Sequence, residues 1–429
     1  MPNPPQLSKI LTWQNPLDFA QKIADSYSGH SWCLLYSGLS AEVKNSRSHI
    51  ALFPQKKIIS DDFFAAEKIL KNSEEKWFGY LSYEVAQQFE NLPKVKKPSL
   101  PFPKIHLVNF SLTFEFDHDR KTLTAFFSDP KQLDEVSSYK VAKSSKTDFE
   151  VSEISSNFSD ESYLKSVSEI KKKIELGDCY QSNLTRKFFG KFSKKLDQKE
   201  NFRLFSDLTK LSPANYSSFF KLDENYLISS SPELFLKIEK NVVLSRPIKG
   251  TASRSEDLSQ DKKNKSALKN SVKERAENLM IVDLVRNDLS KVCEPGSVVA
   301  KKLFEITSYK NIHHMSSEIH GEIGKKFSML DVVRACFPPG SMTGAPKIKA
   351  MEIAAKKEKI ERGIYSGAVG FFDGNSGANL AVVIRTLLVQ GEKFEFQTGG
   401  AITFDSNPQS ELEEIFSKAK AILKLLTGI

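Results

Sequence analysis

Residues 226–251 read YLISSSPELFLKIEKNVVLSRPIKGT. Two runs rich in apolar and β-branched residues, 226–236 and 242–248, flank a short polar segment, which predicts a β-hairpin. Lys249 follows the second strand and precedes Gly250, at a turn that suits glycine. A single lysine at a strand end is usually a solvated charge, whereas a lysine held in a pocket can act as a nucleophile. Both interpretations of Lys249 stay open on this stretch alone.

Pro232 and Glu233 interrupt the first strand of the predicted hairpin. The neighbouring residues are apolar and we do not expect this strand at an open edge, so burial would raise the pKa of the Glu233 carboxyl. A carboxyl with a raised pKa suits general acid–base catalysis. An exposed glutamate at a strand edge fits this stretch equally well.

The chain has 429 residues, 40% of them hydrophobic, which predicts two domains or one large interlocked domain. A polar, serine-rich segment at 144–159 is the best candidate for a linker. We therefore expect an N-terminal domain over residues 1–150 and a catalytic domain over residues 155–429.

Membrane and secretory signals are weak along the whole sequence. No run approaches the roughly 20 apolar residues of a membrane span, and the N-terminus lacks the basic-then-apolar order of a signal peptide. The four cysteines lie far apart without a CxxC pair, which argues against a zinc site or a disulfide framework. We expect a cytoplasmic enzyme with no membrane association.

The net charge of +9 raises the question of nucleic-acid binding. The densest lysine cluster lies on a predicted helix: Lys262, Lys263, Lys265, Lys269 and Lys273. No aromatic residues that could stack on bases are interleaved with these lysines. We interpret them as a solvated surface and expect no nucleic-acid partner, although positive charge also favours a small polyanionic substrate.

One long helix is predicted over residues 266–289. It places Glu277 on an apolar stripe, one turn from Ile281. Because charges are rarely buried without a partner, Glu277 is expected to face a cation or a metal ion.

A second set of carboxylates follows Asn407-Pro408, which predicts the start of a C-terminal helix. Glu411, Glu414 and Lys418 then lie on one face of that helix. If the two helices meet, their carboxylates could hold Mg²⁺ while water and substrate complete its oxygen shell. An ordinary salt-bridged helix surface fits the spacing alone better.

Several polar or glycine-rich segments could line a cavity. Gln181 and Asn183 share one face of a predicted strand. Residues 338–347 form a glycine- and proline-rich loop before a helix, where backbone amides can hold an anion. Arg385 stands inside a predicted strand over residues 378–389, and buried arginines usually grip a carboxylate. The pair Gly399-Gly400 permits close approach of a ligand.

Taken together, these segments resemble the chorismate-utilising enzymes, most closely their aminodeoxychorismate synthase component I branch. The resemblance covers essentially everything from residue 160 onward, and more loosely the N-terminal part. It rests on the following motifs in one order: DCYQSNL at 178–184, SPEL at 231–234, RPIKGT at 246–251, RAENLMIVDLVRND at 275–288, PPGSMTGAPK at 338–347, YSGAVG at 365–370 and IRT at 384–386.

The resemblance implies an α+β fold in which two packed antiparallel β-sheets are surrounded by helices. It also implies Mg²⁺ as cofactor and chorismate, a dianion, as substrate. The implied metal-holding carboxylates are Glu277, Glu411 and Glu414. The residues implied to bind the substrate carboxylates are Arg385 and Lys418, together with the backbone amides near Gly399 and Gly400. The other implied pocket residues are Gln181, Thr251, Thr343, Tyr365 and His314, with His313 as a competitor for the last place.

Within this family, Lys249 marks a branch point. Relatives that make anthranilate usually carry alanine there, and isochorismate-forming relatives place a lysine where this chain has Gln181. The resemblance therefore implies amination of chorismate at C4 to 4-amino-4-deoxychorismate, with Lys249 as nucleophile and Glu233 as proton donor. An anthranilate synthase large subunit is the nearest alternative, and a non-catalytic basic binding protein is a distant one.

The resemblance has two further implications. The sequence shows no glutaminase-like cysteine in a glycine-rich turn, so ammonia would come from a separate glutamine amidotransferase subunit. In relatives a tryptophan can lie in the first domain near a segment similar to residues 34–38, which makes that segment a candidate tryptophan pocket.

Overall fold

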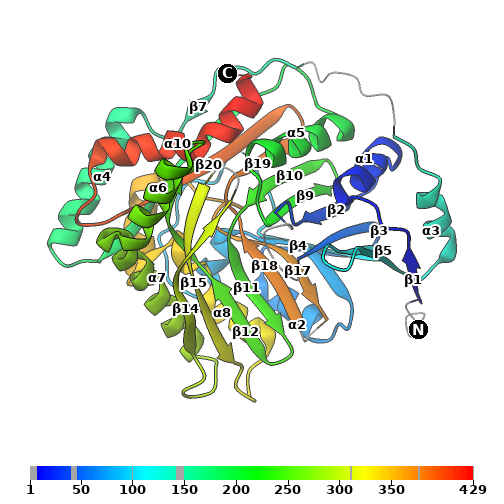
Figure 1. Ribbon diagram of the computed structural model, residues 1–429, viewed down its shortest axis with the longest axis horizontal. Coiled ribbons are helices and arrows are strands. Elements are labelled where there is room, and N and C mark those ends of the chain that lie inside the picture. Colours follow the sequence, from blue (N-terminus) through cyan, green and yellow to red (C-terminus); the bar gives the residue numbers. More distant parts are fainter. Residues whose placement is uncertain are drawn as a thin grey trace.

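Two antiparallel β-sheets, joined along the neighbouring strands β3 (Arg47–Ser60) and β5 (Ile105–Asp117), form the framework of the protein (Figure 1). This computed structural model describes residues 7–39, 46–98, 100–141, 149–309, 312–374 and 377–428. The part of the predicted linker at 144–148 lies outside these residues. Strand β2 pairs with β9 and strand β4 with β17, so hydrogen bonds join the N-terminal and C-terminal parts of the chain, and the domain boundary stays a prediction.

The first sheet contains, in spatial order, β1 (Leu7–Leu11), β6 (Thr122–Phe127), β5, β3, β2 (Trp32–Tyr36), β9 (Tyr216–Leu222), β10 (Asn225–Ser231), β19 (Thr386–Gln390), β20 (Lys393–Ile402) and β8 (Gln181–Lys191). Strand β8 also pairs with two short strands, β7 (Ser155–Ser156) and β16 (Gly344–Ala345).

The second sheet continues from β5 through β4 (Lys76–Leu81), β17 (Ala368–Asp373), β18 (Gly377–Val382), β11 (Leu234–Glu239), β12 (Val242–Arg246) and β15 (Ile312–Glu322). Strands β13 (Ile248–Ser253) and β14 (Val299–Ser308) pair with β15. A hairpin forms here as predicted, from β11 and β12. Its first strand begins at Leu234 and not at residue 226 as predicted, because Asn225–Ser231 form β10 of the first sheet.

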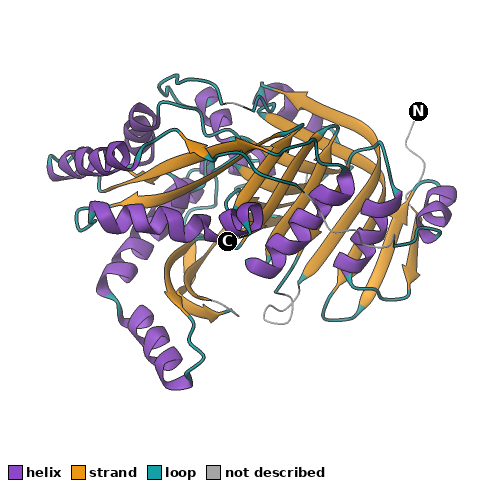
Figure 2. Ribbon diagram, turned by 90° about the horizontal axis from the view of Figure 1, so that it is seen from above, coloured by secondary structure: helices purple, strands orange, loops and turns teal. Residues whose placement is uncertain are grey.

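The helices cover the outer faces of the two sheets (Figures 1 and 2). The first sheet packs against α1 (Pro16–Ser26), α3 (Pro130–Ser137), α4 (Asp160–Glu175), α5 (Gln198–Leu211) and α10 (Pro408–Thr427). The second packs against α2 (Phe63–Lys71), α7 (Val272–Ser290) and α8 (Met329–Cys336). Helix α9 (Lys347–Glu358) lies against β8 of the first sheet and places Ile353 in the first apolar group and Met351 in the second. The remaining helical segments are α6 (Leu258–Asn270) and the short η1 (Tyr83–Gln88) and η2 (Gly340–Met342). None of the helices in the described ranges is long and apolar enough to cross a membrane.

A third group of buried apolar side chains lies between the two sheets. It contains Phe78 and Val108 from one end of the framework and Phe220 and Leu388 from the other. Burying these faces away from water drives the sheets together. The predicted arrangement of two packed antiparallel sheets with helices outside is therefore confirmed.

The chain crosses between the two sheets at two points that lie side by side. It leaves β10 of the first sheet and enters β11 of the second at Pro232 and Glu233. It returns from β18 to β19 at Arg385, whose φ of 51° breaks the extended backbone. The N–H of Val382 donates to the Glu233 carbonyl at 3.0 Å, and the N–H of Ser230 donates to the Arg385 carbonyl at 3.1 Å. The prediction of one strand over residues 378–389 is therefore wrong.

The predicted helix over residues 266–289 is also two helices, α6 and α7. Ser271 separates them with an extended backbone (φ −64°, ψ 114°), and its hydroxyl accepts the N–H of Glu274 at 3.2 Å. A serine side chain that caps a new helix in this way ends the preceding one. The start of α10 is confirmed, because Asn407 caps the helix and Pro408 is its first residue.

Candidate active site

Glu233 lies at the first crossing and is only 5% exposed. The Ser341 hydroxyl and the backbone N–H of Ile248 donate hydrogen bonds to its carboxylate. Burial nevertheless raises the pKa of Glu233 to about 7, against the opposing effects of these donors and of the Lys249 ammonium. The prediction of a raised pKa is confirmed, and this carboxyl can donate a proton near neutral pH.

Lys249 is half-buried in β13, and its ammonium lies among carboxylates. Its charge opposes the burial that raises the pKa of Glu233 and of Glu274, and it adds to the effect of Lys418 that holds the pKa of Glu414 below its usual value. Within the described part of the chain, Nζ of Lys249 makes no hydrogen bond or ion pair. The adjacent Gly250 has a φ of +94°, and a Cβ there would lie 2.9 Å from Oε2 of Glu274. Glycine therefore lets a carboxylate of α7 approach the backbone beside Lys249.

Two buried polar side chains, those of Gln181 on β8 and His314 on β15, have no hydrogen-bond partner among the described residues. Neither amide atom of Gln181, which is 0% exposed, and neither ring nitrogen of His314 is satisfied. Burial, with the nearby charges of Arg385 and His313, lowers the pKa of His314 to about 3, so its ring is neutral. Buried polar atoms are usually paired, so this set indicates the place of a polar ligand.

Arg385 is the cation of the same pocket. Its Nη1 lies 3.3 Å from the Ser212 hydroxyl, and no carboxylate of the described residues comes within 4.0 Å of its guanidinium. Burial lowers the pKa of Arg385, while the charge of Glu233 opposes that effect. An inward-facing guanidinium without a protein carboxylate is suited to bind a carboxylate of a ligand.

His313, the competitor of His314, has partners for both ring nitrogens. Nδ1 lies 2.9 Å from the Ser308 hydroxyl and Nε2 lies 3.1 Å from Oδ1 of Asp261. His313 therefore has a structural role in this geometry, and His314 is the histidine with unpaired ring atoms.

The C-terminal helix α10 brings carboxylates and a lysine beside the glycine pair of β20. Lys418 Nζ lies 2.5 Å from Oε1 of Glu414 and donates to the Gly399 carbonyl at 2.8 Å. A Cβ at Gly400 would lie 2.9 Å from Oε2 of Glu411. The predicted face of α10 is thus confirmed, and glycine at 400 leaves room next to a carboxylate oxygen.

The carboxylates of α10 differ in their electrostatics. Burial and the charge of Glu414 raise the pKa of Glu411, against a hydrogen bond from Ser406. Burial alone would also raise the pKa of Glu414, but the ammonium of Lys418 holds it below its usual value. Oε2 of Glu411 has no hydrogen-bond partner among the described residues.

The two acidic helices are coupled across the site. The charges of Glu277 on α7 and Glu414 on α10 both raise the pKa of Glu274, after the larger effect of burial. In the described ranges, no three acidic, histidine or cysteine side chains are already arranged to hold a metal ion. The chemistry of the donors still fits Mg²⁺, because Oε2 of Glu411 is a buried, unpaired carboxylate oxygen beside the space left by Gly400.

The remaining predicted pocket residues, Thr343, Tyr365 and Thr251, differ in how deeply they are buried. Thr343 is 1% exposed, and its hydroxyl donates to the Gly340 carbonyl at 3.1 Å. Tyr365 is buried close enough to Glu233 for that charge to contribute to its raised pKa, which burial chiefly causes. Thr251 pairs with His314 across β13 and β15 but is exposed. The structure thus gathers these predicted residues around one region, with Thr251 at its rim.

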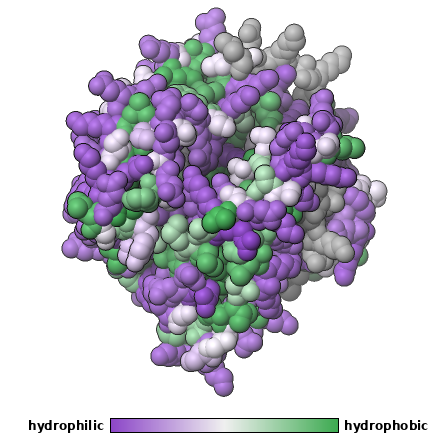
Figure 3. All heavy atoms as spheres, turned by 60° about the vertical axis from the view of Figure 1, so that its left-hand side comes forward, coloured by the Kyte–Doolittle hydropathy of each residue, from purple (hydrophilic) through white to green (hydrophobic). Residues whose placement is uncertain are grey.

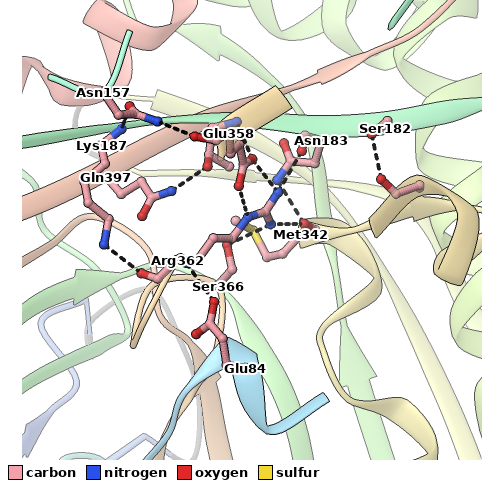
Figure 4. Close-up of polar contacts among 12 residues, drawn as sticks. Glu84, Asn157, Ser182, Asn183, Lys187, Met342, Glu358, Arg362, Ser366 and Gln397 are labelled. Atoms are coloured by element: carbon pink, nitrogen blue, oxygen red, sulfur yellow. Dashed lines mark hydrogen bonds and ion pairs between the residues drawn. The ribbon is translucent and has the colours of Figure 1, made fainter. Parts of the chain in front are cut away.

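A buried network of charges lies behind the pocket (Figure 4). Arg362 is 2% exposed, and Nη2 and Nε donate to the two carboxylate oxygens of Glu358 at 2.8 and 2.9 Å. Nη1 donates to the Met342 carbonyl and Nη2 to the Asn183 carbonyl, both at 2.8 Å. Glu84 of η1 accepts the backbone N–H of Arg362 at 2.7 Å. This network ties η1, β8, α9 and the loop at 338–347 together.

Several residues of the site were not predicted from the sequence. Ser341 and Ser212 contact Glu233 and Arg385, but a serine in a loop gives no distinctive pattern. Glu274 lies three residues before Glu277 and therefore on the same helix face, a signal that the sequence did contain. Figure 3 brings the side of the molecule with α4, α7 and α10 forward and shows a hollow lined largely by hydrophilic residues.

Residues 27–424 match the family of chorismate binding enzymes, and the chain belongs to this family. It is therefore a chorismate-utilising enzyme, and the sequence-based assignment to this class is confirmed.

Individual relatives fall into more than one branch. The chain is 35% identical over 353 residues to anthranilate synthase component 1 of Saccharolobus solfataricus, which covers 82% of this chain and 80% of the relative. It is 32% identical over 349 residues to aminodeoxychorismate synthase component 1 of Escherichia coli, which covers 81% and 76%. The crystal structure of anthranilate synthase component I from Streptococcus pneumoniae superposes with a TM-score of 0.78 at 22% identity, over 88% of this chain and 92% of that one, and supports the fold.

Proposed function

We propose that this enzyme aminates chorismate at C4 with ammonia and gives 4-amino-4-deoxychorismate. The observation that carries the proposal is Lys249, whose amine has no partner among the described residues and lies close enough to Glu233 for its charge to oppose the raised pKa of that carboxyl. The nucleophile and the proton donor thus lie within electrostatic reach of each other. The likeness to aminodeoxychorismate synthase component 1 of E. coli supports this choice of reaction.

The reaction would proceed in two displacements. In the first, Lys249 Nζ, as free amine, forms a bond to C2, both conjugated double bonds of the ring shift, and the C4–O bond breaks. Glu233 donates its proton, so the hydroxyl leaves as water. In the second, ammonia forms a bond to C4, both double bonds shift back, and the C2–Nζ bond breaks. The proton lost by the ammonia nitrogen returns to Glu233, so chorismate and ammonia give 4-amino-4-deoxychorismate and water.

The remaining side chains would hold the substrate in place. Arg385 would bind one carboxylate of chorismate in a bidentate way, and Gln181 and His314 would gain hydrogen bonds that they lack without a ligand. Holding the ring in this orientation converts a collision into a near-intramolecular step.

Mg²⁺ would be held by Glu277, Glu411 and Glu414, and when bound it would neutralise a carboxylate of the substrate. Binding is testable without activity, by titrating Mg²⁺ into the protein in a calorimeter. Wild type should give a measurable heat of Mg²⁺ binding. Glu411→Gln should bind Mg²⁺ at least tenfold more weakly or not at all, whereas Glu413→Gln, on the exposed side of α10, should bind like wild type. Equal binding by all three proteins would contradict this assignment.

Ammonia would come from a separate glutamine amidotransferase subunit. The names of relatives as component 1 support a two-component enzyme, and all four cysteines of this chain are free and buried rather than exposed as nucleophiles. A free ammonium salt should replace this subunit in a test of the chain alone.

The decisive experiment is product analysis with chorismate, Mg²⁺ and ammonium salt. Wild type should form 4-amino-4-deoxychorismate, Lys249→Ala should lose most of that activity, and Lys265→Ala, an exposed lysine of α6, should keep it. Without ammonia, intact wild-type protein should gain the mass of chorismate less water, and Lys249→Ala should not.

The nearest alternative predicts different products. The 35% identity to an anthranilate synthase component 1 favours it as the second candidate. If anthranilate and pyruvate appear and Lys249→Ala changes little, the enzyme is an anthranilate synthase and Lys249 is not its nucleophile.

A further inference from the structure

Lys347, the first residue of α9, directs its ammonium back under the loop that precedes this helix. Nζ lies 2.6 Å from Oδ2 of Asp288 and donates to the carbonyls of Cys336 at 2.8 Å and Pro338 at 2.9 Å. Three partners match the three N–H donors of the ammonium group. Asp288 of α7 is 2% exposed, so this ion pair is buried. Lys347 therefore fastens the end of α8 and the start of the loop to α7.

The same loop is fastened on its other side as well. Arg362 Nη1 and Asn183 Nδ2 donate to the Met342 carbonyl at 2.8 and 3.1 Å (Figure 4). Between the two attachments, a Cβ at Gly340 would lie 3.1 Å from Cδ2 of Leu284, so the loop lies directly on α7. Ser341 is thus held between two fixed points.

Ser341 connects this loop to the proton donor. It is 7% exposed, and its hydroxyl donates to the carboxylate of Glu233. Glu233, Ser341 and Asp288 line one small cavity, together with Cys336 and Gly340. Among the described residues Asp288 makes no hydrogen bond or ion pair with Glu233, and its link to the loop runs through Lys347.

We propose that the buried ion pair of Asp288 and Lys347 positions the Ser341 hydroxyl against Glu233, and that these two residues are positioning residues for the proton transfer. The inference rests on the proposed function in that Glu233 is the proton donor. The sequence alone places Asp288 at a helix end, where a local charge pair explains it; the contact with Lys347, distant along the chain, gives it this second role.

The other charged groups around Glu233 come from different elements. Lys249 of β13, Lys418 of α10 and Arg385 at the second crossing act on Glu233, and Glu233 acts on Tyr365 before β17. None of them touches Lys347 among the described contacts. A change at Lys347 therefore reaches Glu233 through Ser341, whose hydrogen bond stabilises the charged carboxylate.

The test compares kcat as a function of pH in variants of the full chain. Ser341→Ala and Lys347→Met should each lower kcat by about 10- to 100-fold, because the proton donor is misplaced. Each should also move the fall in activity at high pH upward by about one pH unit, since the lost hydrogen bond favoured the charged form. Combining both changes should add little to either effect, because both act on the same hydrogen bond.

Lys291→Met is the matched control. Lys291 also pairs with Asp288, at 2.9 Å, but its side chain is 54% exposed and its ammonium holds no loop carbonyl. It should keep the kcat and pH profile of wild type. Lys347→Met leaves the buried carboxylate of Asp288 with only the exposed Lys291 as its cation, so the double variant Asp288→Asn/Lys347→Met, which removes both charges, guards against failure to fold.

The inference is overturned if Lys347→Met or the Asp288→Asn/Lys347→Met variant behaves like Lys291→Met. It is also overturned if the effects of Ser341→Ala and Lys347→Met multiply in the combined variant. The identity of the wild-type product tests the proposed function separately. Should the product be anthranilate, the same profiles measured by chorismate consumption still decide whether this ion pair positions Ser341.

Discussion

The protein contains two buried polar regions that lie close together and differ in how their hydrogen bonds are satisfied. Around Arg362, the guanidinium nitrogens are occupied by the carboxylate of Glu358 and by two backbone carbonyls. Around Glu233, the described contacts leave both polar atoms of Gln181 and both ring nitrogens of His314 without a partner. Unpaired buried groups cost free energy, so a protein keeps them where a ligand supplies the missing partners.

This difference separates two roles that charge alone does not distinguish. Arg362 is buried and Arg385 is half-buried, and both carry a guanidinium. The first is gripped by Glu358 at 2.8 Å, whereas the second meets only the hydroxyl of Ser212 at 3.3 Å among the described residues. We infer that the Arg362 network holds the framework of the pocket and that the unsatisfied set receives the substrate. Substitutions on each side should therefore fail in different ways.

The largest effect is expected at Glu233. Glu233→Gln removes the proton donor and should lower kcat by about 10²- to 10⁴-fold. Because burial raises the pKa of Glu233 to about 7 and the protonated form is the donor, wild-type kcat should fall as the pH rises through about 7. The residual activity of Glu233→Gln should lack this fall, as rates measured from pH 5.5 to 9 would show.

The stability of the folded variant is the control for this prediction. A buried glutamine carries no charge, so Glu233→Gln should be at least as stable as wild type at pH 8. A variant that keeps more than a tenth of the wild-type kcat would remove Glu233 from the proton transfer.

Arg362→Met should cost stability instead. It leaves the carboxylate of Glu358 buried without its cation and frees the Asn183 carbonyl, so the free energy of unfolding should fall by about 3–5 kcal/mol. Urea denaturation followed by circular dichroism measures this change. A loss below about 1 kcal/mol would mean that the ionic network contributes little, and the contrast between the two regions would fail.

Much of the framework could be predicted from the sequence, because β-hairpins, helix caps and the glycines that end helices are marked by local sequence patterns. The β11–β12 hairpin and the Asn407-Pro408 start of α10 are of this kind. The crossings at Glu233 and Arg385 could not be predicted in this way. Alternation of apolar residues continues through a change of sheet, and only the pairing partners reveal it.

The site was predictable where a charged residue stands out from apolar surroundings, as Glu233 and Arg385 do, or where helical spacing places charges on one face, as for Glu411 and Lys418. Resemblance to a family then linked residues that spacing alone left separate. Ser341 and Lys347 could not be found by either route, because their importance comes from contacts with Glu233 and Asp288 that only the folded chain creates.

Arg385→Met is the matched counterpart of Arg362→Met. It removes a guanidinium that has no carboxylate partner in the described protein, so the free energy of unfolding should change by less than about 1 kcal/mol. The loss of a charge-assisted hydrogen bond to the substrate, worth about 1.5–3 kcal/mol, should raise the KM for chorismate about 10- to 150-fold. Steady-state kinetics and urea denaturation of the same preparation measure both quantities. A destabilisation as large as that of Arg362→Met would show that Arg385 supports the fold.

The smallest effect should be found at Gln181, and its sign is informative. Gln181→Met keeps nearly the same volume but removes a buried amide whose two polar atoms are unpaired among the described residues. The protein without substrate should therefore become more stable by about 1 kcal/mol, while kcat/KM for chorismate falls. The midpoint of urea denaturation, measured with and without chorismate, separates these effects, because the ligand should stabilise wild type more than the variant. If Gln181→Met is instead less stable without substrate, the amide is already satisfied in the free protein, and Gln181 belongs with Arg362 among the groups that hold the framework.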